Sequence, residues 1–204
     1  MIEIYFDGAC EPINPGGTAS YGYLVKKDGR IITQDSRIIG SGAGMTNNVA
    51  EYTGLIEAVK TVSDLNNKKE KVRIYGDSNI VCNTIAKKWG WNKKKTVWNP
   101  HKNAPHLKPL LEEALNLLKK FDYEIKWIPS KDNQQADQLS REPLIKAGII
   151  KAESQKESCP ECDGYLIERK GPFSRFYGCS NYPKCRFTKK MSEAYMTNKE
   201  STKI

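Results

Sequence analysis

The sequence predicts an α/β domain with a mixed sheet flanked by helices, followed by a small cysteine-rich unit. The first part of this prediction rests on the order of its elements. Strand-like runs open the chain, and helices then alternate with strands, an order that is typical of a mixed sheet with helices on its faces. The second part rests on four of the six cysteines, which fall within residues 159–185. A chain of 204 residues is long enough for one ordinary domain and a small second one.

The first expected element is a strand at residues 2–7. Ile2, Ile4 and Phe6 alternate with polar residues there, as in a strand with one buried face. Asp7 ends this strand on the face opposite Ile4 and Phe6, and a turn-rich loop is expected after it. We therefore expect the Asp7 carboxylate to be held by a rigid element and open to solvent.

The next elements follow from turn residues, helix caps and apolar spacing. A hairpin turn at residues 27–29 separates two expected strands. Thr46 or Asn47 then caps a helix that carries Glu51 in its first turns, where the helix dipole favours an acidic side chain. These elements are a loop at residues 8–17, strands at 19–26 and 30–39, and a helix at 46–63.

A second strand that ends in aspartate follows, at residues 72–76 before Asp77. Two such strands that are neighbours in one sheet place two carboxylates side by side, and such a pair repels itself unless a cation lies between. This pattern suggests a metal site. The remaining expected elements are a helix from Ser78 to about Lys88, a helix that opens at Pro105, a strand at 123–128, and a helix that Asp132 or Asn133 caps and that carries Asp137.

The charge of the chain favours a polyanionic partner. The net charge is +9, and no acidic residue occurs between Asp77 and Glu112. Three tryptophans are interleaved with lysines in residues 89–104, which we call the basic segment. Cations and flat aromatic rings together suit phosphates, sugars and bases, so nucleic acid is the expected partner. No apolar run approaches the ~20 residues of a membrane span, and no signal peptide is evident, so the expected location is the cytoplasm.

Four short motifs, taken in order, resemble type 1 ribonuclease H over residues 1–147. Each motif alone is common, and the resemblance rests on their order and spacing together. They are Asp7-Gly8, Thr46-Asn47-Asn48-Val49-Ala50-Glu51, Tyr75-Gly76-Asp77-Ser78, and Trp127-Ile128-Pro129-Ser130 with Ala136-Asp137.

This resemblance implies a five-stranded mixed sheet and an endonuclease that hydrolyses the RNA strand of RNA/DNA hybrids, leaving 5′-phosphate ends. It also implies two Mg²⁺ or Mn²⁺ ions, with Asp7 bridging both, Glu51 and Asp77 holding one, and Asp137 holding the other. The residue types fit, because carboxylate oxygens are what these hard cations prefer, and a metal pair suits in-line phosphodiester displacement.

The resemblance also implies contacts with the hybrid. It places three asparagines on backbone, sugars or base edges, and it places Thr46 at a phosphate of the DNA strand, although Thr46 and Asn47 are equally suited to cap a helix. The basic segment matches in position the family's basic protrusion, which grips the DNA strand. The residues implied are Asn14, Thr46, Asn47, Asn48, Trp89, Trp91, Lys93, Lys94 and Lys95.

One departure from the family pattern lies in the loop before the last aspartate. Many members carry a mobile histidine there, which is thought to help release product. Residues 129–136 contain none, and the two histidines of the chain are elsewhere. The chain thus resembles the branch of the family that lacks this histidine.

The C-terminal cysteines predict a structural zinc site. Cys159 and Cys162 form one close pair, and Cys179 and Cys185 form another, as in four-thiolate zinc sites. A unit of residues 158–190 is too small to fold on an apolar core alone, so one Zn²⁺ is expected to hold it. We expect a linker at 148–157 and a polar tail at 191–204.

The same unit resembles the C-terminal zinc ribbons of bacterial type I topoisomerases, through Cys-Pro-Glu-Cys and Gly178-Cys-Ser-Asn-Tyr-Pro-Lys-Cys. Those ribbons bind single-stranded DNA, and the resemblance implies the same partner here without topoisomerase activity. The whole chain is expected to act as a monomer. Two alternatives stay open: a DNA nuclease of the same fold that resembles junction resolvases, and a non-catalytic protein that binds hybrids or single strands.

Overall fold

The computed structural model of the chain describes residues 1–65, 70–151, 157–171 and 175–190. The chain divides into two compact units, Met1–Ile150 and Lys151–Ile204. The predicted tail at 191–204 and most of the predicted linker lie outside the described residues. No helix in the described ranges is long and apolar enough to cross a membrane.

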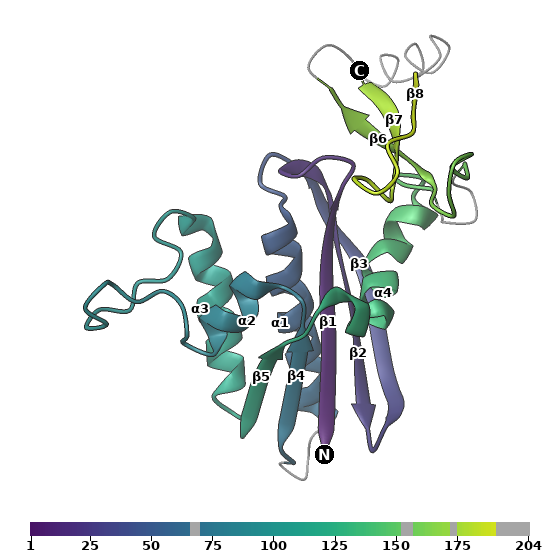
Figure 1. Cartoon of the computed structure of the whole chain (residues 1–204). Helices are drawn as coiled ribbons and strands as arrows, with labels where there is room; N and C mark the ends of the chain where they lie inside the picture. The colour runs from purple at the N-terminus through teal and green to yellow at the C-terminus, as the bar shows by residue number, and fades with distance from the viewer. Residues whose placement is uncertain (66–69, 152–156, 172–174, 191–204) are drawn as a thin grey trace. The chain divides into compact units, whose positions relative to one another are not determined.

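The first unit is built on a five-stranded mixed sheet with the order β3-β2-β1-β4-β5 (Figure 1). β1 runs antiparallel to β2 and parallel to β4, so the predicted mixed sheet is confirmed. The strands are β1 (Ile2–Glu11), β2 (Gly16–Lys27), β3 (Arg30–Gly42), β4 (Val72–Gly76) and β5 (Tyr123–Trp127). The helices are α1 (Asn47–Leu65), α2 (Asn79–Ile85), α3 (Lys108–Leu118) and α4 (Gln134–Lys146), with short 3₁₀ helices η1 (Pro105–Leu107) and η2 (Ser130–Asp132).

Two predicted boundaries were wrong. β1 continues through Asp7 to Glu11, because the residues predicted as a loop pair with β2 as far as Thr18. α2 ends at Ile85 instead of near Lys88, because the backbone turns into the left-handed region at Lys87, with φ of 54°.

The helices cover both faces of the sheet, and glycines let them approach closely. A Cβ atom at Gly8 would lie 2.3 Å from the backbone nitrogen of Glu51 in α1. A Cβ atom at Gly22, which pairs with Asp7, would lie 2.3 Å from the backbone nitrogen of Ser140 in α4. Since successive strand residues point to opposite faces, α1 and α4 lie on opposite sides of β1.

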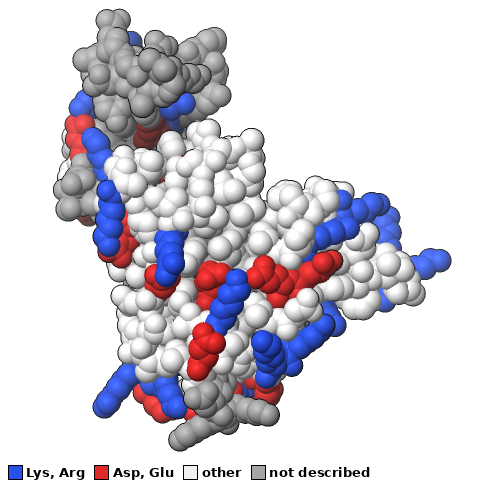
Figure 2. Space-filling view, turned by 180° about the vertical axis from the view of Figure 1, so that it is seen from behind, with Lys and Arg blue, Asp and Glu red and all other residues white. Residues whose placement is uncertain are grey.

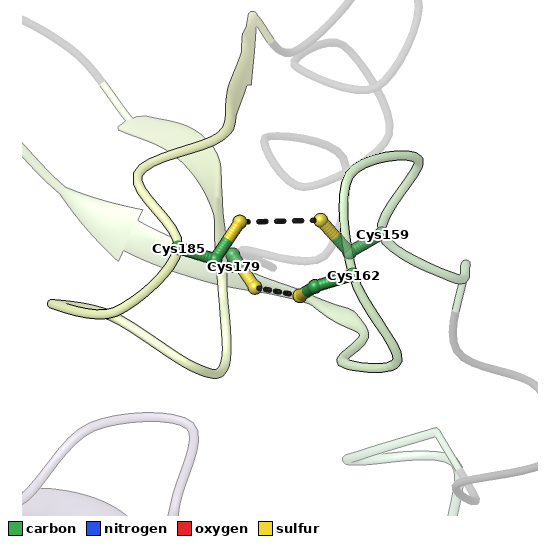
Figure 3. Close-up of side chains that lie close together, drawn as sticks. All are labelled: Cys159, Cys162, Cys179 and Cys185. Carbon is green, nitrogen blue, oxygen red and sulfur yellow. Dashed lines mark hydrogen bonds between the residues drawn. The ribbon is translucent and has the colours of Figure 1, made fainter.

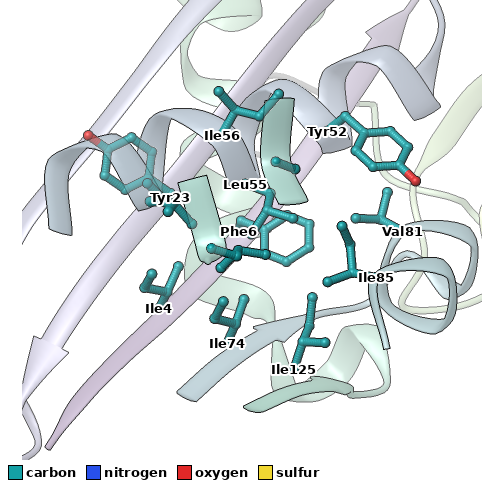
Figure 4. Close-up of a cluster of buried hydrophobic side chains, with 14 of the residues drawn as sticks. Ile4, Phe6, Tyr23, Tyr52, Leu55, Ile56, Ile74, Val81, Ile85 and Ile125 are labelled. Carbon is teal, nitrogen blue, oxygen red and sulfur yellow. The ribbon is translucent and has the colours of Figure 1, made fainter. Parts of the chain in front are cut away.

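The core lies between the sheet and the layer formed by α1, α2 and α3 (Figure 4). Ile4, Phe6 and Ile74 project from the central strands, and the fully buried Tyr52 and Leu55 of α1 pack with them. The alternation that predicted the inward face of the first strand is therefore confirmed.

We expect Gly22→Ala to destabilise the first unit. The added methyl group would meet the backbone of α4, which is not free to swing away like a side-chain tip, and overpacking of this kind costs about 1–3 kcal/mol. The measurement is the free energy of unfolding in urea. Gly44→Ala is the matched control, because no atom lies within 4 Å of its Cβ position. Equal unfolding free energies for the two variants would contradict the close approach of α4.

Candidate active site and metal centres

Three carboxylates converge at one end of the central strands. Asp7, Glu51 and Asp77 each offer an oxygen, and these oxygens all lie within 4.8 Å of one another. Asp7 follows Phe6 in β1, and Asp77 follows Gly76 in β4; Phe6 and Gly76 are in register in the parallel pair. The expectation of two neighbouring strand aspartates is therefore confirmed. We call these three residues the acid cluster.

The acid cluster is more buried than expected. Asp7 is 6% exposed and Glu51 is 5% exposed, while Asp77 is half-buried. The prediction that Asp7 is open to solvent was wrong, because α4 packs over it where Gly22 has no side chain. Ser140 of α4 donates a hydrogen bond to Asp7 Oδ2 from this covering helix.

A second set of hydrogen bonds fixes Asp77. Asn133, which is 1% exposed, donates through Nδ2 to Asp77 Oδ1 and to the backbone oxygen of Phe6, both at 2.9 Å. Ser130 donates to the other carboxylate oxygen, and the indole N–H of Trp127 donates to the backbone oxygen of Asp77.

The sequence did not predict that these residues support the carboxylates, although Trp127 and Ser130 belong to one of the four motifs. Asn133 was predicted only as a possible helix cap, yet its side chain makes no capping hydrogen bond. The three-residue spacing between Asp137 and Ser140 was the only signal that both lie on one face of α4.

Burial and mutual repulsion disfavour the charged form of the cluster. Burial, with the nearby charges of Asp77 and Asp137, raises the pKa of Asp7 to about 7, although the Ser140 hydrogen bond opposes this. Burial raises the pKa of Glu51 well above its ordinary value, and Asp7 and Asp77 raise it further. Glu51 Oε2 is buried and has no hydrogen-bond partner among the residues that the structure describes. An oxygen-only donor set with an orphaned carboxylate oxygen fits a hard divalent cation.

Asp137 lies at the rim of the same site. It is in the first turn of α4 and lines a cavity of about 510 Å³ together with the acid cluster. It is not among the carboxylates that lie within 4.8 Å of one another. The fourth acidic position predicted from the sequence thus shares the cavity while standing apart from the three clustered carboxylates.

The predicted hybrid-contact residues divide into two groups around this cavity. Asn47 and Asn48 line it. Thr46 Oγ1 accepts a hydrogen bond from the Val49 N–H at 3.1 Å, so it does cap the helix end. Asn14 Oδ1 accepts from the Asn47 N–H at 3.1 Å and joins the first loop to α1. Neither Thr46 nor Asn14 lines the cavity.

The basic segment presents its aromatic and cationic side chains to solvent. Trp89 and Trp91 are 47% and 41% exposed. Lys93, Lys94 and Lys95 are also exposed and lie in the turn between Trp91 and Trp98, which form an isolated β-bridge. Figure 2 shows Lys and Arg side chains gathered on the projection between α2 and α3. The segment therefore offers a cationic surface separate from the residues that line the acidic cavity.

The four clustered cysteines form the second candidate metal centre (Figure 3). Their sulfur atoms all lie within 4.8 Å of one another, with 3.7 Å between Cys159 and Cys185 and 3.4 Å between Cys162 and Cys179. The backbone N–H of Gly164 donates to the Cys162 sulfur, which helps lower the pKa of that thiol to about 7. Four converging sulfurs with an N–H donor fit a tetrahedral thiolate site.

A three-stranded sheet in the order β6-β7-β8 accompanies this centre. The segment between the two cysteine pairs, residues 164–170, has strand character in its sequence and predicts the first of these strands; the other two were not predicted. The strands are β6 (Leu166–Lys170), β7 (Arg175–Cys179) and β8 (Thr188–Lys190).

Comparison with known proteins agrees with both centres. Residues 1–144 match the family model "RNase H", and residues 156–194 match "Topoisomerase DNA binding C4 zinc finger". The chain is 33% identical to ribonuclease HI of Halobacterium salinarum over 144 residues, which are 70% of this chain and 64% of that protein. It superposes on LC11-RNase H1 in complex with RNA/DNA hybrid with a TM-score of 0.60 at 25% identity, covering 72% of this chain and 99% of that one.

The cysteine-rich unit has relatives of its own. It is 61% identical over 50 residues to DNA topoisomerase 1 of Methanocaldococcus jannaschii, which is 24% of this chain and 7% of that protein. Only the ribbon is shared with that enzyme. The chain therefore belongs to the ribonuclease H family, and a topoisomerase-type C4 zinc ribbon follows its ribonuclease H domain.

Proposed function

We propose that this protein hydrolyses the RNA strand of RNA/DNA hybrids. The observation that carries the proposal is the acid cluster, in which two of three converging carboxylates are buried and one buried oxygen has no partner. Without a cation this arrangement is unfavourable, and with one it is a site for phosphoryl chemistry. Family membership and the hybrid held by LC11-RNase H1 favour this substrate.

The donor set suits two Mg²⁺ or Mn²⁺ ions. We assign Asp7 to both ions, Glu51 and Asp77 to one, and Asp137 to the other. When bound, such ions supply an activated water and stabilise the leaving 3′ oxygen. Hydrolysis of this kind leaves a 5′-phosphate and a 3′-hydroxyl.

The chain's own residues orient these ligands and select the substrate. Ser140 and Asn133 hold the carboxylates of Asp7 and Asp77 from α4 and its N-cap, which limits the reorganisation needed on metal binding. Asn47 and Asn48 line the cavity, where amide groups can exchange hydrogen bonds with the 2′-hydroxyl groups that distinguish RNA from DNA.

Outside the cavity, Asn14 is assigned to the backbone, sugars or base edges of the hybrid, and Thr46 and the basic segment are assigned to the DNA strand. Asn14 and Thr46 flank the start of α1, and Thr46 offers a hydroxyl for a phosphate there. The exposed tryptophans and lysines of the basic segment contact sugars and phosphates of that strand.

The absence of a histidine from residues 129–136 has a consequence for turnover. We place the protein in the branch of the family that lacks this histidine. Product departure then depends on the carboxylates and on water, without an imidazole near Asp137.

The zinc ribbon contributes affinity for nucleic acid. We assign Cys159, Cys162, Cys179 and Cys185 to one Zn²⁺ and single-stranded DNA to the ribbon surface, where Tyr182 is 61% exposed. The proposed division is a catalytic domain at 1–147, a linker at 148–157, the ribbon at 158–190 and a tail at 191–204, in a monomer.

Asp7→Asn should lower hybrid cleavage at least ~10³-fold, because it removes a negative ligand from the ions while keeping the shape of the side chain. The measurement is metal-dependent cleavage of labelled RNA/DNA hybrid, double-stranded RNA and double-stranded DNA. Glu3→Gln, a change to another acid of β1 that lies outside the cavity, should cleave as the wild type does. Cleavage of DNA would favour the resolvase-like alternative, and binding without cleavage in Mg²⁺ or Mn²⁺ would favour the non-catalytic one.

Asp7→Asn should also stabilise the protein in buffer without added divalent ions, increasingly as pH rises. The folded-state pKa of Asp7 is raised from 3.8 to about 7. Protonated Asp7 therefore adds its whole contribution to the free energy of unfolding below about pH 4, and this contribution is lost as the pH rises through about 7. The difference between these two pKa values corresponds to at most roughly 4 kcal/mol in the free energy of unfolding.

Urea unfolding from pH 4 to 8 measures this effect, with Glu3→Gln as the control. The advantage of Asp7→Asn should vanish near pH 4 and reverse at pH 8 when Mg²⁺ is added. An advantage that is independent of pH would refute a carboxylate charge as its cause.

The double substitution Cys159→Ser and Cys185→Ser should release the zinc, since two thiolates cannot hold it in a tetrahedral site. Zinc content by mass spectrometry should fall from one to none, while Cys82→Ser, which alters a buried thiol in α2, should retain it. Cleavage should survive, but nucleic-acid affinity and its salt dependence should both fall. Unchanged affinity and salt dependence would show that the ribbon serves another role, such as protein contact.

A further inference from the structure

The basic segment is stiffened mainly by its own hydrogen bonds. Trp91 and Trp98 form a β-bridge. Asn92 Oδ1 accepts from the Thr96 N–H at 2.8 Å and closes the turn between the tryptophans. These interactions give the segment a shape. At its base, Trp98 and Ala104 pack against the hydrophobic core, and the Trp89 N–H donates to the Asn83 carbonyl of α2 at 3.1 Å.

One side-chain hydrogen bond ties the basic segment to the helix that carries Glu51. His101 Nε2 lies 2.7 Å from the hydroxyl of Tyr52, and the two rings meet edge to face at 86°, with centroids 5.5 Å apart. Tyr52 directly follows Glu51 in α1 and is fully buried. In the ranges that the structure covers, no other side-chain hydrogen bond joins the basic segment to a helix or strand.

The direction of this hydrogen bond follows from the surroundings of both groups. The phenol of Tyr52 carries its proton at neutral pH and can donate it to the imidazole nitrogen at 2.7 Å. Burial lowers the pKa of His101, and the positive charges of His106 and Lys108 act in the same sense. We therefore assign Tyr52 as the donor to a neutral imidazole, so that this hydrogen bond joins α1 to the basic segment.

The backbone at His101 is consistent with an imposed position. Its φ of 57° lies in the left-handed region, which costs free energy for a residue with a side chain. The His101 carbonyl accepts from the Ala104 N–H at 3.0 Å, which holds the turn toward η1. The segment therefore re-enters the domain in a conformation that points the imidazole at Tyr52.

We propose that Tyr52 and His101 are positioning residues that hold the basic segment in register with the acid cluster. The inference rests on the proposed hybrid cleavage. A hybrid gripped by the exposed tryptophans and lysines must place one phosphodiester over the carboxylates. An anchored segment makes these two contacts at once, whereas a loose one loses ordering entropy on each binding event. The pair thus governs substrate binding without touching the reacting atoms.

The test is a double-mutant cycle of steady-state cleavage with the full chain, using His101→Phe, Tyr52→Phe and the double variant. His101→Phe keeps a ring against Tyr52 but removes the acceptor, and it should raise KM for the hybrid about five- to tenfold with kcat nearly unchanged. Tyr52→Phe should do the same, and the double variant should be no worse than either single one. His101→Gln, which returns an acceptor near the position of Nε2, should restore most of the affinity.

Two controls separate positioning from general damage. His106→Phe changes an exposed histidine with no side-chain hydrogen bond in the described structure and should leave KM unaltered. Melting temperatures identify any variant that is merely unfolded. Additive KM effects, a fall in kcat alone, or no rescue by His101→Gln would each overturn the proposal. A folded wild-type protein that cleaves no hybrid would instead contradict the proposed function.

Discussion

The burial of two carboxylates beside each other is the constraint on which the site depends. Asp7 belongs to β1, and Glu51 belongs to α1, which lies on the face of the sheet opposite α4. The two carboxylates meet because glycines let the backbones of these helices approach the sheet closely. Gly8 lets α1 approach β1, and Gly22 lets α4 cover Asp7. The same close packing that excludes water also raises the pKa values of both carboxylates, so the fold is arranged around a site that favours a bound cation.

The hydrogen bonds around the cluster offset only part of this cost. Ser140 lowers the pKa of Asp7, yet desolvation outweighs it and the net change is upward. Glu51 lacks even this help at Oε2. Neutral donors therefore orient the carboxylates, while neutralising them is left to a metal ion or a proton. Asn133 is an example, because its amide donates both to the Phe6 carbonyl of β1 and to the Asp77 carboxylate. It fixes the position of the carboxylate relative to the strand but does not neutralise its charge.

The sequence predicted the parts of the site that depend on local pattern. The alternation in the first strand predicted its buried face. The two aspartates that end strand patterns predicted a metal site on the condition that their strands are neighbours, as β1 and β4 are. Burial of Asp7 was missed because it depends on α4, more than 120 residues later, and on glycines whose role appears only in the packed sheet. Tyr52 and His101 are 49 positions apart and share no motif, so their contact could not be predicted from spacing. The ribbon strands after the first were missed because the cysteines, rather than an apolar alternation, organise that unit.

The two candidate metal centres differ in how far the surrounding fold depends on a bound ion. The acid cluster is set in a domain with an extensive apolar core, so the fold exists before the ion arrives, and ion binding can relieve repulsion without building structure. The ribbon has a small cluster of buried residues that is mostly cysteine, so we expect its fold to depend on a bound ion. Loss of a carboxylate should therefore change chemistry while leaving the fold intact, and loss of a thiolate should remove the fold of the ribbon while leaving the chemistry of the first domain. The basic segment is stiffened by its own hydrogen bonds, and within the described residues one side-chain hydrogen bond joins it to α1. We therefore expect it to influence where the nucleic acid is held.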